Sequence, residues 1–113
     1  MFYKIILIDF AFAESNNSKL RPALTLTKPS KQFGDLIVAA ITSNILRKPQ
    51  PGDVRIEKDD QDFVKTGLKT SSIIRLNKLV TIHVSRVKNE LGVLPQKYHM
   101  NIHKGIKAVL SLS

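Results

Sequence analysis

The stretch Asp35–Thr42, which reads DLIVAAIT, is a short apolar run with polar segments on both sides. Short runs rich in Ile and Val are typical of strands buried in a sheet. The run Tyr3–Phe10 has the same character. Arg21–Thr27, from Leu24 onward, and Asp53–Glu57 alternate polar and apolar residues, as strands with one wet face do. The segment Ser71–Thr81 predicts one or two further strands. These runs together predict a mostly β protein.

Turn chemistry separates these runs. Polar loops are predicted at residues 11–20, 28–34 and 43–52, and an acidic turn at 59–62. The spacing then changes, because Val84, Val87 and Leu91 recur at helical intervals and Gly92 is suited to end a helix. A last helix is predicted after Pro95, with an apolar stripe of Ile102, Ile106, Val109 and Leu110. Short strands followed by a C-terminal helix predict a small SH3-like barrel.

The length of the chain predicts a single domain. Its 113 residues form one unit, 1–113, large enough to bury a core without disulfides, and it contains no cysteine. No apolar run approaches the length that crosses a bilayer, and the N-terminal run is too short for a signal peptide. We therefore expect a cytoplasmic protein that has no membrane partner.

The charge is concentrated in one half of the chain. The formal net charge is +9, and residues 63–113 hold nine Lys or Arg side chains but a single acidic one, Glu90. Residues 1–62 are nearly balanced, with nine basic and eight acidic side chains. Such an asymmetry favours a polyanionic partner, either a nucleic acid or an acidic protein.

Three ordered segments carry a family resemblance. The first joins Ile6–Phe10, through a loop, to Lys19–Leu24; the second is Val38–Ser43; the third runs from Gly67 to Leu76 and on to Ile82. A short helix containing Arg86 and then Gly92–Leu94 would follow. In this order and spacing the chain resembles the MazF/PemK family of bacterial toxins, in type II toxin–antitoxin systems, although an acidic residue that several members have near Ser71 is missing here.

The resemblance implies a function. It implies a small barrel of the MazF/PemK/CcdB kind, a homodimer, and a sequence-preferring endoribonuclease that cleaves single-stranded RNA, including mRNA. It also implies a cognate antitoxin whose disordered acidic tail occupies the basic groove. The chemistry needs neither a metal nor a cofactor, because the ribose 2′-hydroxyl itself attacks the phosphorus.

Two residues are the candidates for catalysis. Arg21 supplies a guanidinium that can grip two phosphate oxygens in a fixed fork, and the resemblance implies that it acts at the scissile phosphate. Thr42 supplies a hydroxyl that could donate to a phosphoryl oxygen or orient the attacking 2′-hydroxyl. Without the family, a strand-edge arginine and a β-branched strand residue are the plainer interpretations of both positions.

Further polar residues are candidates for binding the RNA. They lie next to Thr42, on the loop that follows it, or on the basic second half of the chain: Ser43, Asn44, Arg47, Lys48, Ser72 and Arg75. Each of them is also compatible with ordinary surface polarity.

The histidines and the predicted fold are compatible with functions other than RNA cleavage. His99 and His103 are four residues apart, a spacing that metal ligands use, but no acidic residue lies near them in sequence, so surface histidines are the better interpretation. His83 is placed to cap a helix. A barrel of this kind is also compatible with a non-catalytic binding module, or with a toxin of the same fold directed at DNA gyrase.

Overall fold

The computed structural model of the protein describes residues 2–10 and 19–112. These residues form one six-stranded sheet in the order β4-β5-β3-β2-β1-β6, with every neighbouring pair antiparallel. The strands are β1 (Lys4–Phe10), β2 (Lys19–Thr25), β3 (Asp35–Thr42), β4 (Asp53–Ile56), β5 (Ser72–His83) and β6 (Val87–Val93). The helical segments are the 3-10 turns η1 (Phe63–Thr66), η2 (Val84–Arg86) and η3 (Gln96–Tyr98), and the helix α1 (His99–Val109).

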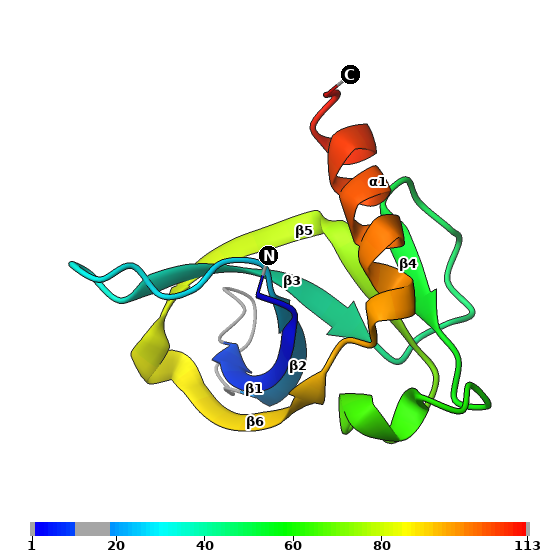
Figure 1. The fold of residues 1–113 in the computed structure, drawn as a ribbon, viewed down its shortest axis with the longest axis horizontal. Coiled ribbons are helices and arrows are strands. Elements are labelled where there is room, and N and C mark those ends of the chain that lie inside the picture. The colour runs from blue at the N-terminus through cyan, green and yellow to red at the C-terminus, as the bar shows by residue number, and fades with distance from the viewer. Residues whose placement is uncertain (1, 11–18, 113) are drawn as a thin grey trace.

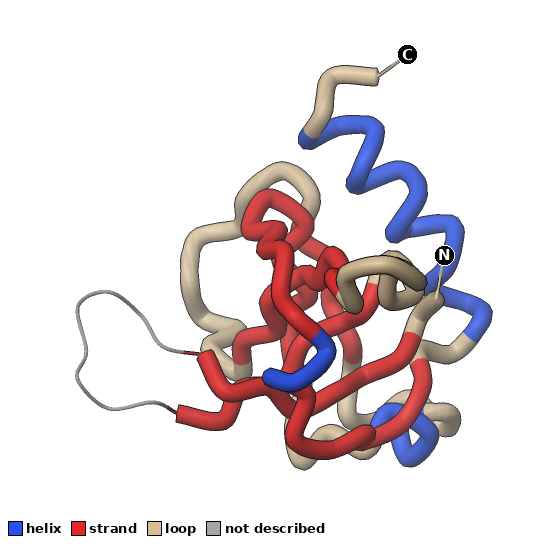
Figure 2. The backbone as a smooth tube through the Cα atoms, turned by 90° about the vertical axis from the view of Figure 1, so that its left-hand side faces the viewer, coloured by secondary structure: helices blue, strands red, loops and turns tan. Residues whose placement is uncertain are grey.

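The sheet curls strongly, and α1 packs beside β4 and β5 at one side of it (Figures 1 and 2). The 3-10 turn η1 follows the outer strand β4 in the chain and lies against the other outer strand, β6. A Cβ atom added to Gly67 would lie 2.1 Å from the Leu91 carbonyl oxygen, and one added to Gly92 would lie 2.1 Å from the Lys65 carbonyl oxygen. Glycine at both positions lets the two backbones touch. This contact connects the two ends of the curled sheet. The six-stranded sheet and the helix after it confirm the predicted mostly β fold with a C-terminal helix.

Both faces of the central strands are buried. The larger hydrophobic cluster includes Ile5, Leu24 and Ile41 and receives Ile102 from α1, whereas the smaller cluster includes Ile6. Residues adjacent in sequence point to opposite faces of a strand. A strand buried on both faces is therefore apolar throughout, which explains why β1 and β3 were the clearest strands in the sequence.

The sequence located most strands correctly. The predicted segments at 3–10, 35–42 and 53–57 contain β1, β3 and β4, and the run 71–81 forms the single long strand β5. The predicted loop 11–20 is wrong at its end, because Lys19 and Leu20 belong to β2 and pair with β1. The rest of that prediction, residues 11–18, lies outside the described part of the chain.

The predicted helix spanning Val84 to Leu91 is wrong. Only Val84–Arg86 make a helical turn, capped as expected by the His83 side chain, which accepts a hydrogen bond from the Ser85 amide. The residues that follow form β6, which pairs with the outer side of β1. Two irregularities interrupt this pairing, so the apolar residues of β6 do not alternate and the strand is invisible to a periodicity argument.

The last helix begins later than expected. Pro95 precedes the turn η3, and α1 itself starts at His99. Ile102 is fully buried, whereas Leu110, the last member of the predicted stripe, is 53% exposed. In the described ranges, 2–10 and 19–112, no helix has both the length and the apolar character that crossing a membrane requires.

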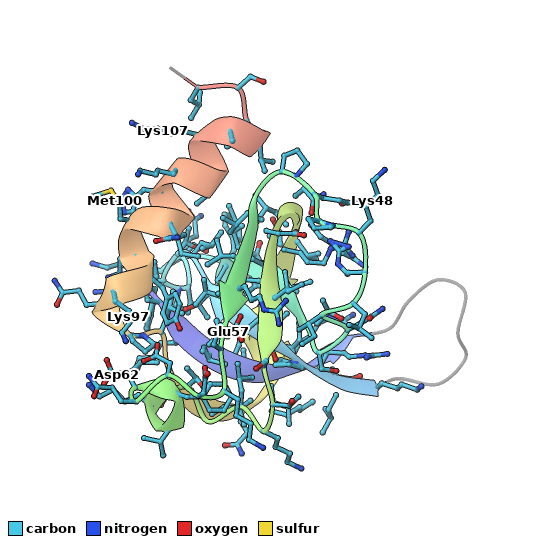
Figure 3. The ribbon with its side chains drawn as sticks, turned by 90° about the vertical axis from the view of Figure 1, so that its right-hand side faces the viewer. Lys48, Glu57, Asp62, Lys97, Met100 and Lys107 are labelled. Carbon is cyan, nitrogen blue, oxygen red and sulfur yellow. The ribbon has the colours of Figure 1, made fainter. Side chains whose placement is uncertain are left out.

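An ion-pair cluster fastens the start of α1 to the acidic turn before η1. The Asp60 carboxylate accepts hydrogen bonds from Lys97 Nζ at 2.5 Å and from the Tyr98 hydroxyl at 2.7 Å. Lys97 also lies 3.5 Å from Asp62, and Figure 3 shows the two side chains at the foot of the helix. Lys97 first, and Tyr98 next, lower the pKa of Asp60 to about 2, whereas burial and then the Asp60 contact raise the pKa of Tyr98 to about 12.

We expect Asp60→Asn to lower the free energy of unfolding at pH 7. The pKa of Asp60 falls from its ordinary 3.8 to about 2 on folding, so its stabilising effect is complete above pH 3.8 and is lost as the pH falls through 2. The deficit of the variant should therefore shrink over this interval, as measured by urea unfolding at a series of pH values. Asp59→Asn, at the exposed neighbouring position, is the control, and a deficit that does not change with pH would contradict the assignment.

Candidate functional site

A cavity of about 170 Å³ opens where β2 and β3 stop pairing. Ala23 pairs with Ala40 and Leu24 with Ala39, and the same register continued by two residues would set Arg21 opposite Thr42. The strands are no longer paired at that point, so the two side chains border a hollow. The residues that line it are Ile8, Arg21, Pro22, Ala23, Val38, Ala40, Ile41, Thr42, Arg75 and Lys78.

The cavity is strongly cationic. Arg21 enters it from β2, and Arg75 and Lys78 enter it from β5. The β3–β5 pairing skips from Ala39–Leu79 to Ala40–Arg75, so an irregularity in β5 lies at the cavity. Such irregularities re-aim side chains, and here Arg75, the last paired residue before the irregularity, and Lys78, within it, line the same cavity. No carboxylate is found among the described residues that line it, which makes it suited to an anion.

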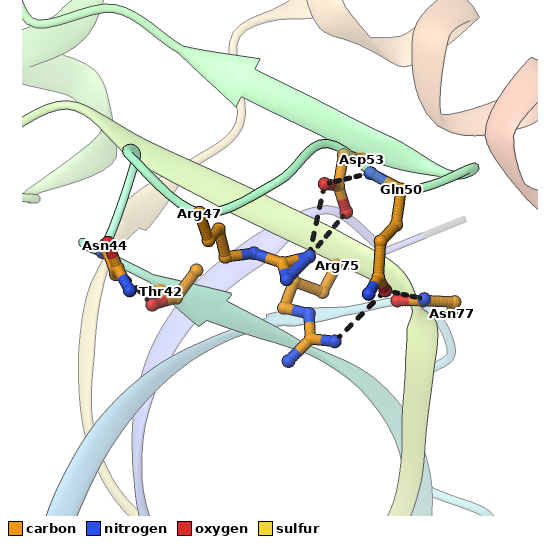
Figure 4. Close-up of polar contacts among 7 residues, drawn as sticks. All are labelled: Thr42, Asn44, Arg47, Gln50, Asp53, Arg75 and Asn77. Carbon is orange, nitrogen blue, oxygen red and sulfur yellow. Dashed lines mark hydrogen bonds and ion pairs between the residues drawn. The ribbon is translucent and has the colours of Figure 1, made fainter.

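The Thr42 hydroxyl is held in place by the chain that follows it. Its oxygen accepts a hydrogen bond of 3.1 Å from the Asn44 backbone N–H (Figure 4). A hydroxyl that accepts in this way keeps its own hydrogen for donation elsewhere. The side chain is half-buried at the cavity wall, so it can meet a ligand there.

Arg75 is positioned by Gln50, which the sequence did not single out. Gln50 Oε1 accepts hydrogen bonds from Arg75 Nη2 at 3.4 Å and from Asn77 Nδ2 at 2.6 Å (Figure 4). The Asp53 carboxylate in turn accepts a hydrogen bond of 3.0 Å from the Gln50 backbone N–H. The loop between β3 and β4 therefore fixes a cation on β5, and no local pattern in the sequence announces this contact.

The other loop cations lie elsewhere. Arg47 Nη2 contacts both carboxylate oxygens of Asp53 at 3.2 Å, and both side chains are largely buried. Lys48 is exposed, and neither Arg47 nor Lys48 lines the cavity. The structure thus gives Arg47 a role in holding the loop, beside the RNA-tracking role predicted for it.

A second cavity, of about 490 Å³, adjoins the first and shares Arg21, Pro22 and Ile41 with it. It contains two of the remaining candidates, Ser43 and Ser72. Ser72 is buried and donates a hydrogen bond of 3.0 Å to the Thr70 carbonyl, whereas Ser43 is exposed. Asn44 lines neither cavity and contributes its backbone contact to Thr42.

The histidines are placed away from this region. His99 stacks on the Tyr3 ring, with ring centroids 3.7 Å apart, and its Nε2 lies 3.0 Å from the Leu94 carbonyl oxygen. In the part of the chain that the structure describes, no group of three or more His, Asp or Glu side chains is arranged to hold a metal ion. His99 therefore serves the packing between α1 and the start of the chain.

The comparisons with known proteins identify relatives over almost the whole chain. A sequence model of the family described as PemK-like, MazF-like toxin of type II toxin–antitoxin system matches residues 2–110. Endoribonuclease MazF2 of Mycobacterium bovis and endoribonuclease MazF6 of Mycobacterium tuberculosis are each 25% identical over 101 residues, covering 87% of this chain and 84% of theirs.

Solved structures share the fold. The Mycobacterium tuberculosis toxin MazF-mt6 superposes with a TM-score of 0.76 at 21% identity, covering 97% of this chain and 98% of the toxin. A mycobacterial endoribonuclease in complex with its cognate antitoxin superposes with a TM-score of 0.75 at 14% identity, covering 100% of this chain and 96% of that one. At these identities the structural likeness establishes the fold, and the sequence match establishes the kinship.

We expect Asp53→Ala to destabilise the protein by about 2 kcal/mol, because it leaves the largely buried Arg47 guanidinium without its carboxylate. Urea unfolding measures the change. Asp35→Ala removes an exposed carboxylate and should alter stability by less than about 0.5 kcal/mol. Equal stabilities of the two variants would show that the Arg47 contact is not structural.

Proposed function

This chain belongs to the family of PemK-like, MazF-like toxins of type II toxin–antitoxin systems, and we propose that it is an endoribonuclease that cleaves single-stranded RNA without a metal ion. The observation that carries the proposal is the cavity in which Arg21, Thr42, Arg75 and Lys78 meet from three strands. Three cations and a hydroxyl around one hollow suit a phosphodiester.

The proposed reaction uses the RNA as its own nucleophile. The ribose 2′-hydroxyl loses its proton and its oxygen bonds to the adjacent phosphorus, while the bond from phosphorus to the 5′-oxygen breaks and that oxygen takes up a proton. The products are a 2′,3′-cyclic phosphate and a 5′-hydroxyl. Negative charge grows on the phosphoryl oxygens during the step, so fixed positive charge beside them lowers the barrier.

Arg21 is the proposed main stabiliser of that charge. It is exposed on β2 at the mouth of the cavity, where a phosphate can reach it from solvent. The guanidinium fork can bind two phosphoryl oxygens at once. An arginine stays protonated at neutral pH, which favours charge stabilisation over proton removal as its role.

Thr42 is the proposed hydrogen-bond donor opposite Arg21. Because its oxygen already accepts from the Asn44 amide, its hydrogen can be directed at a phosphoryl oxygen or at the attacking 2′-hydroxyl. Arg75, held by Gln50, and Lys78 add charge on the β5 side of the same hollow. A ligand held from two sides by pre-positioned groups loses little freedom on reaching the transition state.

The partners follow from the charge and the family. We propose that a cognate antitoxin places an acidic segment over the basic residues of this site, in competition with RNA. A homodimer and a cytoplasmic location, where the RNA substrate is found, belong to the same proposal.

The test is cleavage of a defined RNA by purified, antitoxin-free protein in the presence of EDTA, with the new ends mapped. The proposal requires cleavage at preferred sequences, with 2′,3′-cyclic phosphate and 5′-hydroxyl ends. Salt-dependent RNA binding without any product would indicate a binding module instead. Inhibition of gyrase supercoiling without RNA cleavage would indicate a gyrase-directed toxin.

We expect Arg21→Ala to lower kcat by about 10²- to 10³-fold, since it removes a donor aimed at the developing negative charge. Single-turnover cleavage of the defined RNA measures the loss. Arg55→Ala removes an exposed arginine that lines neither cavity and should keep its activity. Similar activities of the two variants would remove Arg21 from the mechanism.

Thr42→Val keeps the shape of the side chain and removes only the hydroxyl, so we expect kcat to fall by about 10²-fold with little change in stability. Thr81→Val, at an exposed position on β5, is the matched control. Retention of full activity by Thr42→Val would restrict this position to a structural role.

A further inference from the structure

The second cavity has no task in the chemistry of the scissile phosphate. It adjoins the catalytic cavity directly, since Arg21, Pro22 and Ile41 border both. Its volume of about 490 Å³ falls within the range of about 300–1,000 Å³ that is usual for small-molecule pockets, whereas the first cavity is smaller. When Arg21 holds a phosphate of an RNA chain, a group bound in the second cavity would belong to a nucleotide next to that phosphate.

The lining of this cavity is aliphatic with a polar minority. The apolar walls are formed by Leu7, Pro22, Ile41, Leu68 and Leu91. Hydroxyl groups come from Ser43, Thr70 and Ser72, and positive charge comes from Arg21 and Lys69. No acidic side chain occurs among its described lining residues.

We propose that this cavity is a subsite for one nucleobase of the RNA, next to the cleaved phosphate, and that Lys69 gives it a preference for uracil or guanine. The inference rests on the proposed function and adds the element that reads the sequence. Single-stranded RNA is recognised through bases that are splayed out, covered on their faces and hydrogen-bonded at their edges. Aliphatic walls can cover the faces, and the hydroxyls and the ammonium group can meet the edges.

The preference follows from the donors present. A lysine ammonium has three donors and no acceptor, so it favours a base edge with a carbonyl oxygen over one with an amino group. Uracil and guanine present such an oxygen where cytosine and adenine present an amino group. Ser72 adds no further donor for the base edge, because its hydroxyl hydrogen is already directed at the Thr70 carbonyl, so the proposed preference rests on Lys69.

An apolar side chain of a partner protein is the competing occupant. Two observations favour RNA: the shared wall with the cationic cavity, and the cation Lys69 in a lining that holds no described carboxylate. A pocket for an apolar side chain needs neither feature, whereas a nucleotide uses both.

The experiment measures binding, so its result does not depend on cleavage. Short fluorescent 2′-O-methyl oligoribonucleotides, which lack the attacking hydroxyl, are titrated with the full-length protein and followed by anisotropy. Each position is replaced in turn by an abasic residue. We expect the abasic residue to weaken binding about tenfold at one position and far less at the neighbouring positions.

Variants tie that position to the cavity. Ser43→Trp fills the cavity from an exposed position and should abolish the effect of the abasic residue, and Thr70→Trp should act in the same way from the segment before β5. Leu46→Trp adds an indole ring to the same loop, at an exposed position outside both cavities, and it should keep the wild-type pattern. Lys69→Ala should reduce the preference for uracil over cytosine at this position to less than twofold, whereas Lys104→Ala, which removes a charge from α1, should preserve it.

The outcomes separate the two proposals. A base-dependent position that responds to these variants, in a protein that does not cleave RNA, supports the subsite and rejects the ribonuclease. Cleavage without any position-specific base effect rejects the subsite alone. Three results would each overturn the subsite. The first is an abasic pattern that Ser43→Trp and Thr70→Trp leave unchanged, and the second is the absence of RNA binding. The third is that filling the cavity abolishes only the binding of an acidic, leucine-containing peptide.

Discussion

The site depends on the register between β2 and β3. Three paired positions, Ala23 to Thr25 on one strand and Val38 to Ala40 on the other, hold the strands together in the buried centre of the sheet. Just beyond them the strands part, and the continued register leaves Arg21 facing Thr42 across a hollow. A slip of one residue would turn each side chain to the other face of the sheet, so the apolar packing that sets the register also sets the geometry of the site.

The rest of the structure positions charge around that opening. The pairing of β5 with β3 is irregular at this point, and Arg75 and Lys78 of β5 line the same cavity. The loop between β3 and β4 then restrains Arg75 through Gln50, and Asp53 restrains the loop through Arg47. Cations in one place repel each other, and a bound anion between them would relieve that repulsion. The contacts that stabilise this loop therefore also position Arg75 at the cavity.

The quality of the sequence interpretation varied with burial. β1 and β3 were correctly located because they are buried on both faces and their apolar character is continuous. β6 was mistaken for a helix because it lies at the edge of the sheet, and two irregularities in its pairing with β1 remove the alternation that marks a strand. Arg21 and Thr42 were predicted from the family resemblance and an argument about phosphate chemistry, and both line the same cavity. The contact of Gln50 with Arg75 and the place of Lys69 beside a cavity could not be predicted in this way, because segments far apart in the sequence form them.

The sequence by itself determined the fold class and the excess of positive charge in the second half, since these follow from composition and from short apolar runs that act locally. The kinship followed from the order and spacing of three resembling segments. Tertiary structure alone decided which polar residues meet. Strand register brought Arg21 to Thr42, β5 brought Arg75 and Lys78 to the same cavity, and the contact of η1 with β6 connected the two ends of the sheet. The physical reason is that a site is made by groups from segments far apart in the sequence. The packing of the whole sheet, rather than any neighbouring residue, sets the distance in space between those groups.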